Sequence, residues 1–186
     1  MFDNRLEAPR DDYAMNPAWS GVVASRPSAV LVPIVARPEM SVIMLQRPAT
    51  MAAHAGEISF PGGKVEAFDA SVVETALREA EEEIGLARSH VEVLGFLDSY
   101  QVRSGFRIVP VVALVTPPFT LQVDTHEVVD AFEVPLAFLM DSTNHSKQSR
   151  EMRGETQWFY AMPYEGRYIW GATAAIVRNL FERLTS

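Results

Sequence analysis

The sequence contains no cysteine among its 186 residues. Without thiols it can form no disulfide and no thiolate metal site, and it offers no cysteine nucleophile. Basic residues are also scarce, since 16 Lys and Arg stand against 24 Asp and Glu, for a formal net charge of −8. This balance disfavours a general grip on nucleic acid or on an anionic membrane, because both need clustered positive charge. We therefore expect no nucleic-acid or membrane partner, and a function that uses acidic side chains.

Long hydrophobic runs are missing as well. No apolar run in the sequence approaches the roughly 20 residues that a helix needs to cross a bilayer. The first residues include acidic side chains and lack the apolar core of a signal peptide. We expect a cytoplasmic protein. A hydrophobic content of 48% suits one domain with a real core.

The order of polar and apolar segments predicts the organisation of the chain. Residues 1–25 are polar and rich in proline, which predicts an irregular N-terminal arm, and residues 26–186 form a single domain. Alternating or continuous apolar patterns predict strands over 29–35, 41–47, 91–100, 107–115, 126–136 and 156–164. Pro33 suggests that the first of these strands is an edge strand or carries a bulge.

Helical spacing occurs in two long segments and one short one. It predicts helices over 70–86, with Asp69 as N-cap, over 168–184, and over a short stretch near 136–140. The polar segment 141–155 predicts a mobile loop, and we place Trp158 and Trp170 in the core. Strands interspersed with two substantial helices favour an α/β sandwich over an all-β barrel.

Residues 76–86 read ALREAEEEIGL and crowd glutamates into little more than one helical turn. On a helix with about 100° per residue, the apolar side chains form one stripe, which consists of Val73, Leu77, Ala80 and Ile84. Glu79, Glu82 and Glu83 fall together on a neighbouring face, whereas Glu74 and Glu81 point to solvent. The cluster is either a solvated acidic face or a site for a hard divalent cation, which prefers oxygen ligands.

The surrounding residues resemble a known motif. The segment GGKVEAFDASVVETALREAEEEIGL (62–86) is similar to the Nudix box, and Arg78 to Leu86 match the second half of that pattern position by position. Asp69, the first acid, is separated from Arg78 by one residue more than the usual spacing. The branch of the family that resembles coenzyme A pyrophosphatases has the same extra residue. The resemblance implies a Nudix-like α/β/α sandwich with a mixed central sheet.

The resemblance also implies a metal site. Glu79, Glu82 and Glu83 would bind Mg²⁺ or Mn²⁺, and the carbonyl of Gly63 is a further candidate ligand. Arg78 would orient the glutamates by salt bridges, which is a supporting role in catalysis.

Enzymes of this family hydrolyse a nucleoside diphosphate linked to another group, so the expected partner is a small molecule of that class. The water that attacks phosphorus needs a base, for which the candidates are Glu82, Glu83 and Glu127. Other residues have open interpretations. His54 and His126 are either loop residues or phosphate contacts, and Tyr100 and Phe106 either pack in the fold or stack on a base.

The segment before the box bears on the substrate. In IMLQRPATMAAHAGEISFPGG (43–63), Arg47, Gly56 and the run 60–63 match a second signature of the coenzyme A branch. Arg47, Gly62 and Gly63 are therefore candidate substrate contacts. The signature is incomplete at three positions, Leu45, Pro48 and Ala52.

The expected substrate is coenzyme A or an acyl derivative. The alternatives are ADP-ribose, a nucleotide sugar, a dinucleotide, and a catalytically silent nucleotide-binding module. The sequence leaves the oligomeric state open, and a homodimer is compatible with it.

Overall fold

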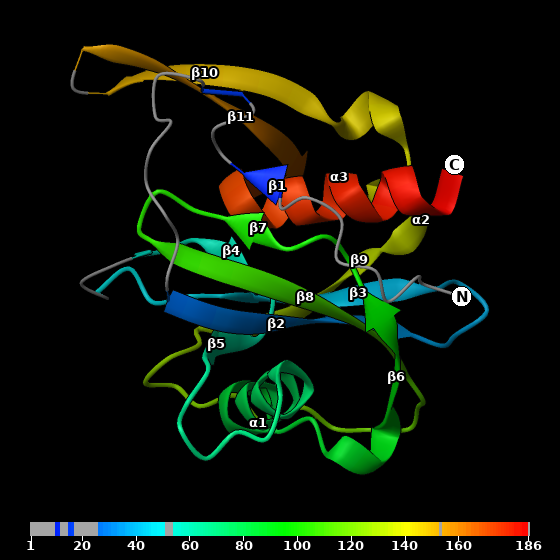
Figure 1. The fold of residues 1–186 in the computed structure, drawn as a ribbon. Helices are drawn as coiled ribbons and strands as arrows, with labels where there is room; N and C mark the ends of the chain where they lie inside the picture. Colours follow the sequence, from blue (N-terminus) through cyan, green and yellow to red (C-terminus); the bar gives the residue numbers. More distant parts are fainter. Residues whose placement is uncertain (1–9, 12–14, 17–25, 51–53, 153, 186) are drawn as a thin grey trace.

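The protein is described by a computed structural model that covers residues 10–11, 15–16, 26–50, 54–152 and 154–185. Helix α1 (Val72–Ile84) lies on one face of a large sheet, and helix α3 (Gly171–Thr185) lies on the other (Figure 1). A short helix, α2 (Leu136–Leu139), and the 3₁₀ turns Arg88–His90 and Ser142–Asn144 complete the helical elements in the described residues. The predicted α/β/α sandwich is confirmed.

Within the described residues, nine strands form the large sheet. They are β1 (Arg10–Asp11), β2 (Arg26–Val35), β3 (Ser41–Gln46), β4 (Ile58–Ser59), β5 (Gly62–Lys64), β6 (Val91–Phe96), β7 (Tyr100–Gln101), β8 (Phe106–Val115) and β9 (Asp130–Pro135). The sheet is mixed, because β2 pairs in parallel with β8 along its whole length and antiparallel with β3 and β5. A second sheet has three antiparallel strands, β10 (Ser146–Met152), β11 (Glu155–Tyr164) and β12 (Arg167–Trp170).

The alternation of side chains along β3 separates two cores. Ile43 and Leu45 pack on the α1 side of the sheet, whereas Val42 and Met44 pack on the α3 side. Because successive side chains in a strand point to opposite faces, Gln46 falls on the α3 side and Arg47 on the α1 side. This alternation becomes important at the end of β3, where the two faces carry different hollows.

Helix α1 begins and ends at capping residues. The side chain of Ser71 accepts a hydrogen bond from the Glu74 amide at 3.2 Å, and Gly85 adopts the left-handed conformation, with φ of 66°, that ends the helix. The prediction that Asp69 caps the helix is wrong, because its carboxylate is used by Arg78 instead. The buried stripe is centred on Ala76, Ala80 and Ile84, with Val73 and Leu77 only partly buried beside it.

Pro33 is not at an edge, contrary to the prediction. It lies in β2, between the stretch that pairs with β5 and the stretch that pairs with β3. Leu31, two residues earlier, donates its amide to Pro61 on the same side. Since amides alternate between the two edges of a strand, the amide that Pro33 lacks would point into this gap, where neither of the two strands pairs. A central strand therefore tolerates the proline.

Three further predictions about the C-terminal region are wrong. The polar segment 141–155 is not a loop, because residues 146–152 form β10 and pair with β11. Tyr168 to Trp170 belong to β12, so that α3 begins only at Gly171. Trp158 is 41% exposed and is not a core residue. When one face of a strand is solvated, alternation of polar and aromatic residues is a weak predictor of the strand and of which side chains are buried.

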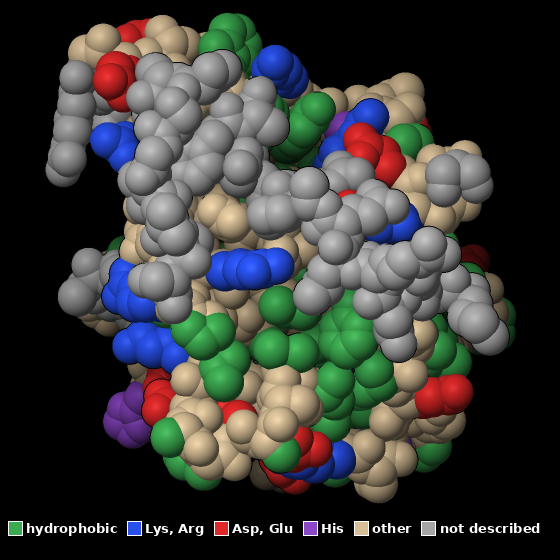
Figure 2. Space-filling view, viewed as in Figure 1, with side chains coloured by type: hydrophobic (Ala, Val, Ile, Leu, Met, Phe, Trp, Pro, Cys, Tyr) green, Lys and Arg blue, Asp and Glu red, His purple; other side chains and the backbone are tan. Residues whose placement is uncertain are grey.

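The sheet also has an exposed apolar edge. On the face drawn in Figure 2, hydrophobic side chains gather around β6, which carries the exposed Val93 and Leu94. β6 pairs only with β8 among the described strands.

Most of the predicted arm, residues 1–25, lies outside the described residues. Two short pieces of it are described. β1 pairs in parallel with β7, and the side-chain amide of Asn16 bonds both backbone groups of Trp158, at 3.0 and 2.7 Å. No helix in the described part of the chain is long and apolar enough to span a membrane.

Candidate active site

A hollow of about 470 Å³ lies where the end of β3, the Gly-Gly segment, helix α1 and the loop before β9 meet. Its lining consists of Arg47, Gly62, Gly63, Lys64, Glu66, Glu79, Glu82, Glu83, Asp124 and Glu127. The predicted metal ligands, candidate bases and substrate contacts all line it, and Arg78, which does not, bonds two of the lining glutamates. Sequence reasoning missed Lys64, Glu66 and Asp124. Lys64 and Glu66 lie inside the box segment, which was a usable signal, whereas Asp124 lies in a loop without a recognisable motif.

Glu83 is the most deeply buried carboxylate of the hollow, with 2% of its side chain exposed. Its Oε2 accepts the Gly62 amide at 2.9 Å, and its Oε1 pairs with the Arg47 guanidinium at 3.1 Å. Burial raises the pKa of Glu83 to about 7, with Glu79 and Glu127 adding like-charge repulsion, although Arg47 and the Gly62 amide act in the opposite direction. The ionised form of Glu83 is therefore disfavoured in the metal-free protein, and a nearby cation would stabilise it.

Arg78 organises the remaining acids of the box. Its Nε and Nη2 bind both oxygens of Asp69 at 3.0 Å, so the pair is bidentate. Its Nη1 bonds Glu79 at 2.8 Å and Glu82 at 2.9 Å. The hydrogen bond from Arg78 holds the pKa of Asp69 well below its usual range. Asp69 thus anchors the guanidinium that holds Glu79 and Glu82 at the hollow.

Glu79 shows how closely the Gly-Gly segment approaches the helix. A Cβ added to Gly63 would lie 2.4 Å from Oε1 of Glu79, whereas one added to Gly62 would lie 2.4 Å from the backbone oxygen of Ala29. Gly62 therefore allows the close approach of strand β2, and Gly63 allows the close approach of the Glu79 carboxylate. Burial also raises the pKa of Glu79, partly opposed by Arg78.

The loop after β8 brings Glu127 to the hollow. The amides of Gln122 and Asp124 donate to the carbonyls of Ile84 and Glu83, at 2.8 and 2.9 Å. Carbonyls in the last turn of a helix have no partner within the helix, so the end of α1 provides the attachment for this loop. This docking places Asp124 and Glu127 opposite the glutamates of the box.

The charge of the hollow fits a divalent cation. Six carboxylate residues line it against two cationic ones, Arg47 and Lys64, which leaves a formal excess of four negative charges when all six acids are ionised. An anionic diphosphate would be repelled unless cations intervened. The donors are hard oxygens, as Mg²⁺ and Mn²⁺ require, and the glycine at 63 leaves the space that Glu79 needs. The acids are not a finished cage, because no three Asp, Glu or His side chains of the described residues are in metal-binding arrangement; Arg78 and Arg47 hold three of the carboxylates.

Several other candidate residues lie elsewhere. His54 is exposed and pairs with Glu57 at 2.8 Å, and His126 is also exposed. Tyr100 is buried in the core, and Phe106 packs under the Arg26 guanidinium at 4.0 Å. These four therefore lie outside the lining of the hollow. Ala52 lies outside the described residues.

Comparisons with known proteins agree with this geometry. A family model described as the NUDIX domain matches residues 25–159. A protein of Yersinia enterocolitica, named as an uncharacterized Nudix hydrolase, NudL, is 40% identical over 160 residues, covering 86% of this chain and 82% of its own.

Two solved structures share the fold at lower identity. The Nudix hydrolase RenU of M. smegmatis has a TM-score of 0.59 at 16% identity, covering 89% of this chain and 95% of its own. The NUDIX domain of Shewanella oneidensis NrtR, complexed with ADP ribose, has a TM-score of 0.54 at 18% identity, covering 93% and 97%.

Proposed function

Because this chain belongs to the Nudix hydrolase family, we propose that it cleaves the diphosphate of coenzyme A or an acyl-coenzyme A with the aid of Mg²⁺ or Mn²⁺. Membership makes it a hydrolase of nucleoside diphosphate derivatives that works with divalent metal ions on small-molecule substrates. The substrate, the metal and the residue roles are the proposed part. The cytoplasmic location and the absence of a nucleic-acid partner stay predictions from the sequence.

The observation that carries the proposal is the hollow with its excess of negative charge. Glu79, Glu82 and Glu83, with the Gly63 carbonyl, would hold the divalent cation. When bound, the cation neutralises phosphate charge and makes a water molecule more acidic. Arg78 keeps Glu79 and Glu82 in place through its salt bridges.

The remaining residues would divide the work of hydrolysis. Arg47 lines the same hollow and offers its guanidinium to a phosphate oxygen. A water oxygen attacks one phosphorus, and the bridging P–O bond breaks, with its electron pair leaving on the other phosphate. Glu82, Glu83 and Glu127 remain the candidates for the base. Glu127 is favoured, because its carboxylate makes no hydrogen bond or ion pair with the described residues and is free to accept the proton.

Coenzyme A is preferred over other diphosphates because of the segment before the box. Arg47 lies in the hollow, and Gly56 has a φ of 70°, which favours glycine. Both positions match the signature of the coenzyme A branch. ADP-ribose, a nucleotide sugar and a dinucleotide remain the alternative substrates. A silent binding module is disfavoured by the presence of all three box glutamates.

A substrate panel tests the proposal. The protein is incubated with coenzyme A, acetyl-coenzyme A, ADP-ribose, a nucleotide sugar and a dinucleotide, each with Mg²⁺, with Mn²⁺ and with EDTA. Mass spectrometry identifies the products. We expect adenosine 3′,5′-bisphosphate and phosphopantetheine from coenzyme A, and none in EDTA. Faster cleavage of another diphosphate would overturn the substrate, and full activity after exhaustive chelation would overturn the metal.

A further inference from the structure

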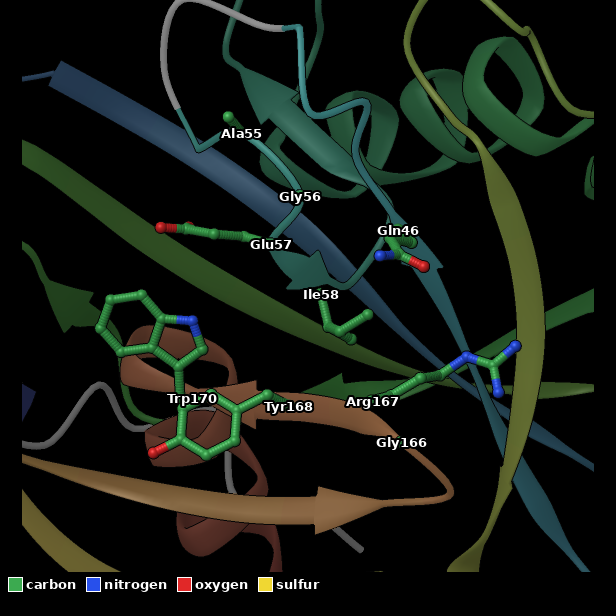
Figure 3. A pocket seen from close by; sticks show the side chains of 9 residues that line it. All are labelled: Gln46, Ala55, Gly56, Glu57, Ile58, Gly166, Arg167, Tyr168 and Trp170. Carbon is green, nitrogen blue, oxygen red and sulfur yellow. The ribbon is translucent and has the colours of Figure 1, made fainter.

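A second hollow, of about 340 Å³, opens on the opposite face of the sheet (Figure 3). Its lining comes from the end of β3, the segment that leads into β4, and the turn and strand of β12. The lining residues are Gln46, Ala55, Gly56, Glu57, Ile58, Gly166, Arg167, Tyr168 and Trp170. Its volume lies in the range of small-molecule sites.

The two hollows meet at the end of β3. Gln46 lines the second hollow and Arg47 lines the first, and these are consecutive residues on opposite faces of the sheet. The Arg47 amide donates to the Glu57 carbonyl at 3.0 Å, which ties the wall of the second hollow to the residue that faces the glutamates. The end of β3 therefore supplies neighbouring residues to both hollows, one on each face of the sheet.

One wall of the second hollow is aromatic. Tyr168 and Trp170 project from the same face of β12 with ring centroids 6.5 Å apart, and they lie next to each other in Figure 3. Arg150 lies over the Trp170 ring at 4.7 Å, and the Tyr168 hydroxyl bonds Gln148. These contacts fix the orientation of both rings. Tyr168 nevertheless remains 42% exposed, which leaves its ring accessible to a ligand.

The other walls offer polar groups. Gln46 presents a side-chain amide, Glu57 a carboxylate, and both come from the chain segments that face β12. The Nε of Arg167 is buried and has no hydrogen-bond partner, although its Nη2 pairs with Asp130 at 2.7 Å. The Arg167 guanidinium also lies over the Phe132 ring at 4.0 Å, so its position at the edge of the hollow is fixed by contacts within the fold.

We propose that this hollow binds the nucleobase of the substrate, and that it prefers a base with an exocyclic amino group, such as adenine. The inference rests on the proposed function. Tyr168 and Trp170 provide a stacking surface for a planar ring. Glu57 accepts from the amino group, and the Gln46 amide can both donate and accept at the base edge. A flexible aliphatic chain would gain less here, because it has no planar face to stack on the rings and no amino group for Glu57 to bind. Tyr168 and Trp170, not Tyr100 and Phe106, are thus the aromatic specificity residues.

The first test measures binding without catalysis. Trp19 and Trp158 are replaced by phenylalanine, so that Trp170 is the remaining tryptophan of the three. AMP and UMP are then titrated in Mg²⁺ buffer while the fluorescence is recorded. We expect AMP to quench Trp170 at concentrations at least about tenfold lower than UMP requires, since stacking and amino-group contacts both favour adenine. Equal quenching by both nucleotides, or none by AMP, would overturn the proposal.

The second test uses the best adenine-containing substrate from the panel. Tyr168→Ser and Trp170→Leu should raise its KM about tenfold to a hundredfold with kcat little changed, which is the sign of lost uniform binding. Tyr168→Phe should retain the wild-type KM. Trp158→Ala is the matched control, because Trp158 is an exposed aromatic residue of the same small sheet that lies outside the lining of the hollow. Unchanged KM values in both Tyr168→Ser and Trp170→Leu would contradict the assignment.

The outcomes separate the two proposals. Quenching by AMP in a protein that cleaves no member of the panel would support the base site and refute the proposed function. Cleavage of coenzyme A without AMP quenching would do the reverse.

Discussion

The two faces of helix α1 carry the same residue type in opposite environments. On the inner face, Glu83 and Glu79 are 2% and 16% exposed, and burial raises the pKa of both. On the outer face, Glu74 and Glu81 are 42% and 52% exposed and pair with Arg88. Exposed pairs of this kind contribute about 0–1 kcal/mol. The outer glutamates therefore behave as an ordinary solvated face, whereas the inner ones are held at a cost to stability, which is typical of a functional site.

Glu82 shows that exposure alone does not separate the faces. Its side chain is 59% exposed, yet it lines the hollow and pairs with Arg78. Each face has its own arginine. Arg78 pairs with Glu79 and Glu82 on the inner face, and Arg88 pairs with Glu74 and Glu81 on the outer face.

The largest effect should come from neutralising the inner face. Glu83→Gln and Glu82→Gln should each lower kcat by roughly a hundredfold or more, since each removes a proposed metal ligand and a candidate base. Glu81→Gln is the matched control on the outer face and should retain wild-type turnover. Steady-state kinetics on the best substrate, with circular dichroism to verify folding, provides the comparison. Equal sensitivity of Glu81 and Glu82 would contradict the assignment of the faces.

Substitutions of the two glycines beside the inner face should have different effects, one on stability and the other on activity. Gly62→Ala should destabilise the fold by about 1–3 kcal/mol, because its Cβ would meet rigid backbone at Ala29. Gly63→Ala should lower activity with little change in Tm, because its Cβ would meet the movable carboxylate of Glu79. Thermal melts and kinetics on both variants give the result. A stability loss in Gly63→Ala as large as in Gly62→Ala would count against a carboxylate site at this position.

The pH dependence of stability should reveal the inner face in metal-free protein. The pKa of Glu83 is about 7 in the fold against an ordinary value of 4.5 for an exposed glutamate, so the folded state binds the proton more tightly. Its stabilising contribution is complete below pH 4.5 and is lost as the pH rises through 7. We expect a loss of up to about 3 kcal/mol between pH 5 and 8.

Urea denaturation in EDTA at these two pH values measures this loss. Glu83→Gln should reduce the difference between them, and saturating Mg²⁺ should stabilise the wild type at pH 8. The same pH difference in wild type and Glu83→Gln would rule out Glu83 as its source.

The smallest effect is expected on the outer face. Arg88→Ala breaks the pairs with Glu74 and Glu81 but should cost less than about 1 kcal/mol and leave kcat unchanged. Urea denaturation at low and high salt is the measurement, and the small difference should shrink as salt screens the pairs. A clear loss of activity would show that the outer face also contributes to the site.

The sequence predicted helix α1 and its acidic face well because the pattern is local. Glutamates at i, i+3 and i+4 share one face whatever the rest of the fold does, and the box spacing defines which acids they are. The long strands β2, β3 and β8 were also predicted, because their apolar runs are strong. Local reasoning failed at Asp69, whose carboxylate binds Arg78, nine residues along the chain, while Ser71 caps the helix.

Features that depend on contacts far apart in the sequence could not be predicted. β10 is polar and is a strand only because β11 pairs with it. Asp124 reaches the hollow because its loop docks on the end of α1. Gln46, Tyr168 and Trp170 line one hollow although they come from distant parts of the chain. No pattern in either segment predicts that the two segments lie together.

The central claim is that the inner glutamates, and not the outer ones, hold a divalent cation. Electron paramagnetic resonance of free Mn²⁺ measures this directly, by titrating the ion into wild type, Glu83→Gln and Glu81→Gln at pH 8. The account predicts that wild type and Glu81→Gln deplete the free-ion signal equally, and that Glu83→Gln binds at least about tenfold more weakly. Equal depletion by all three proteins would contradict it.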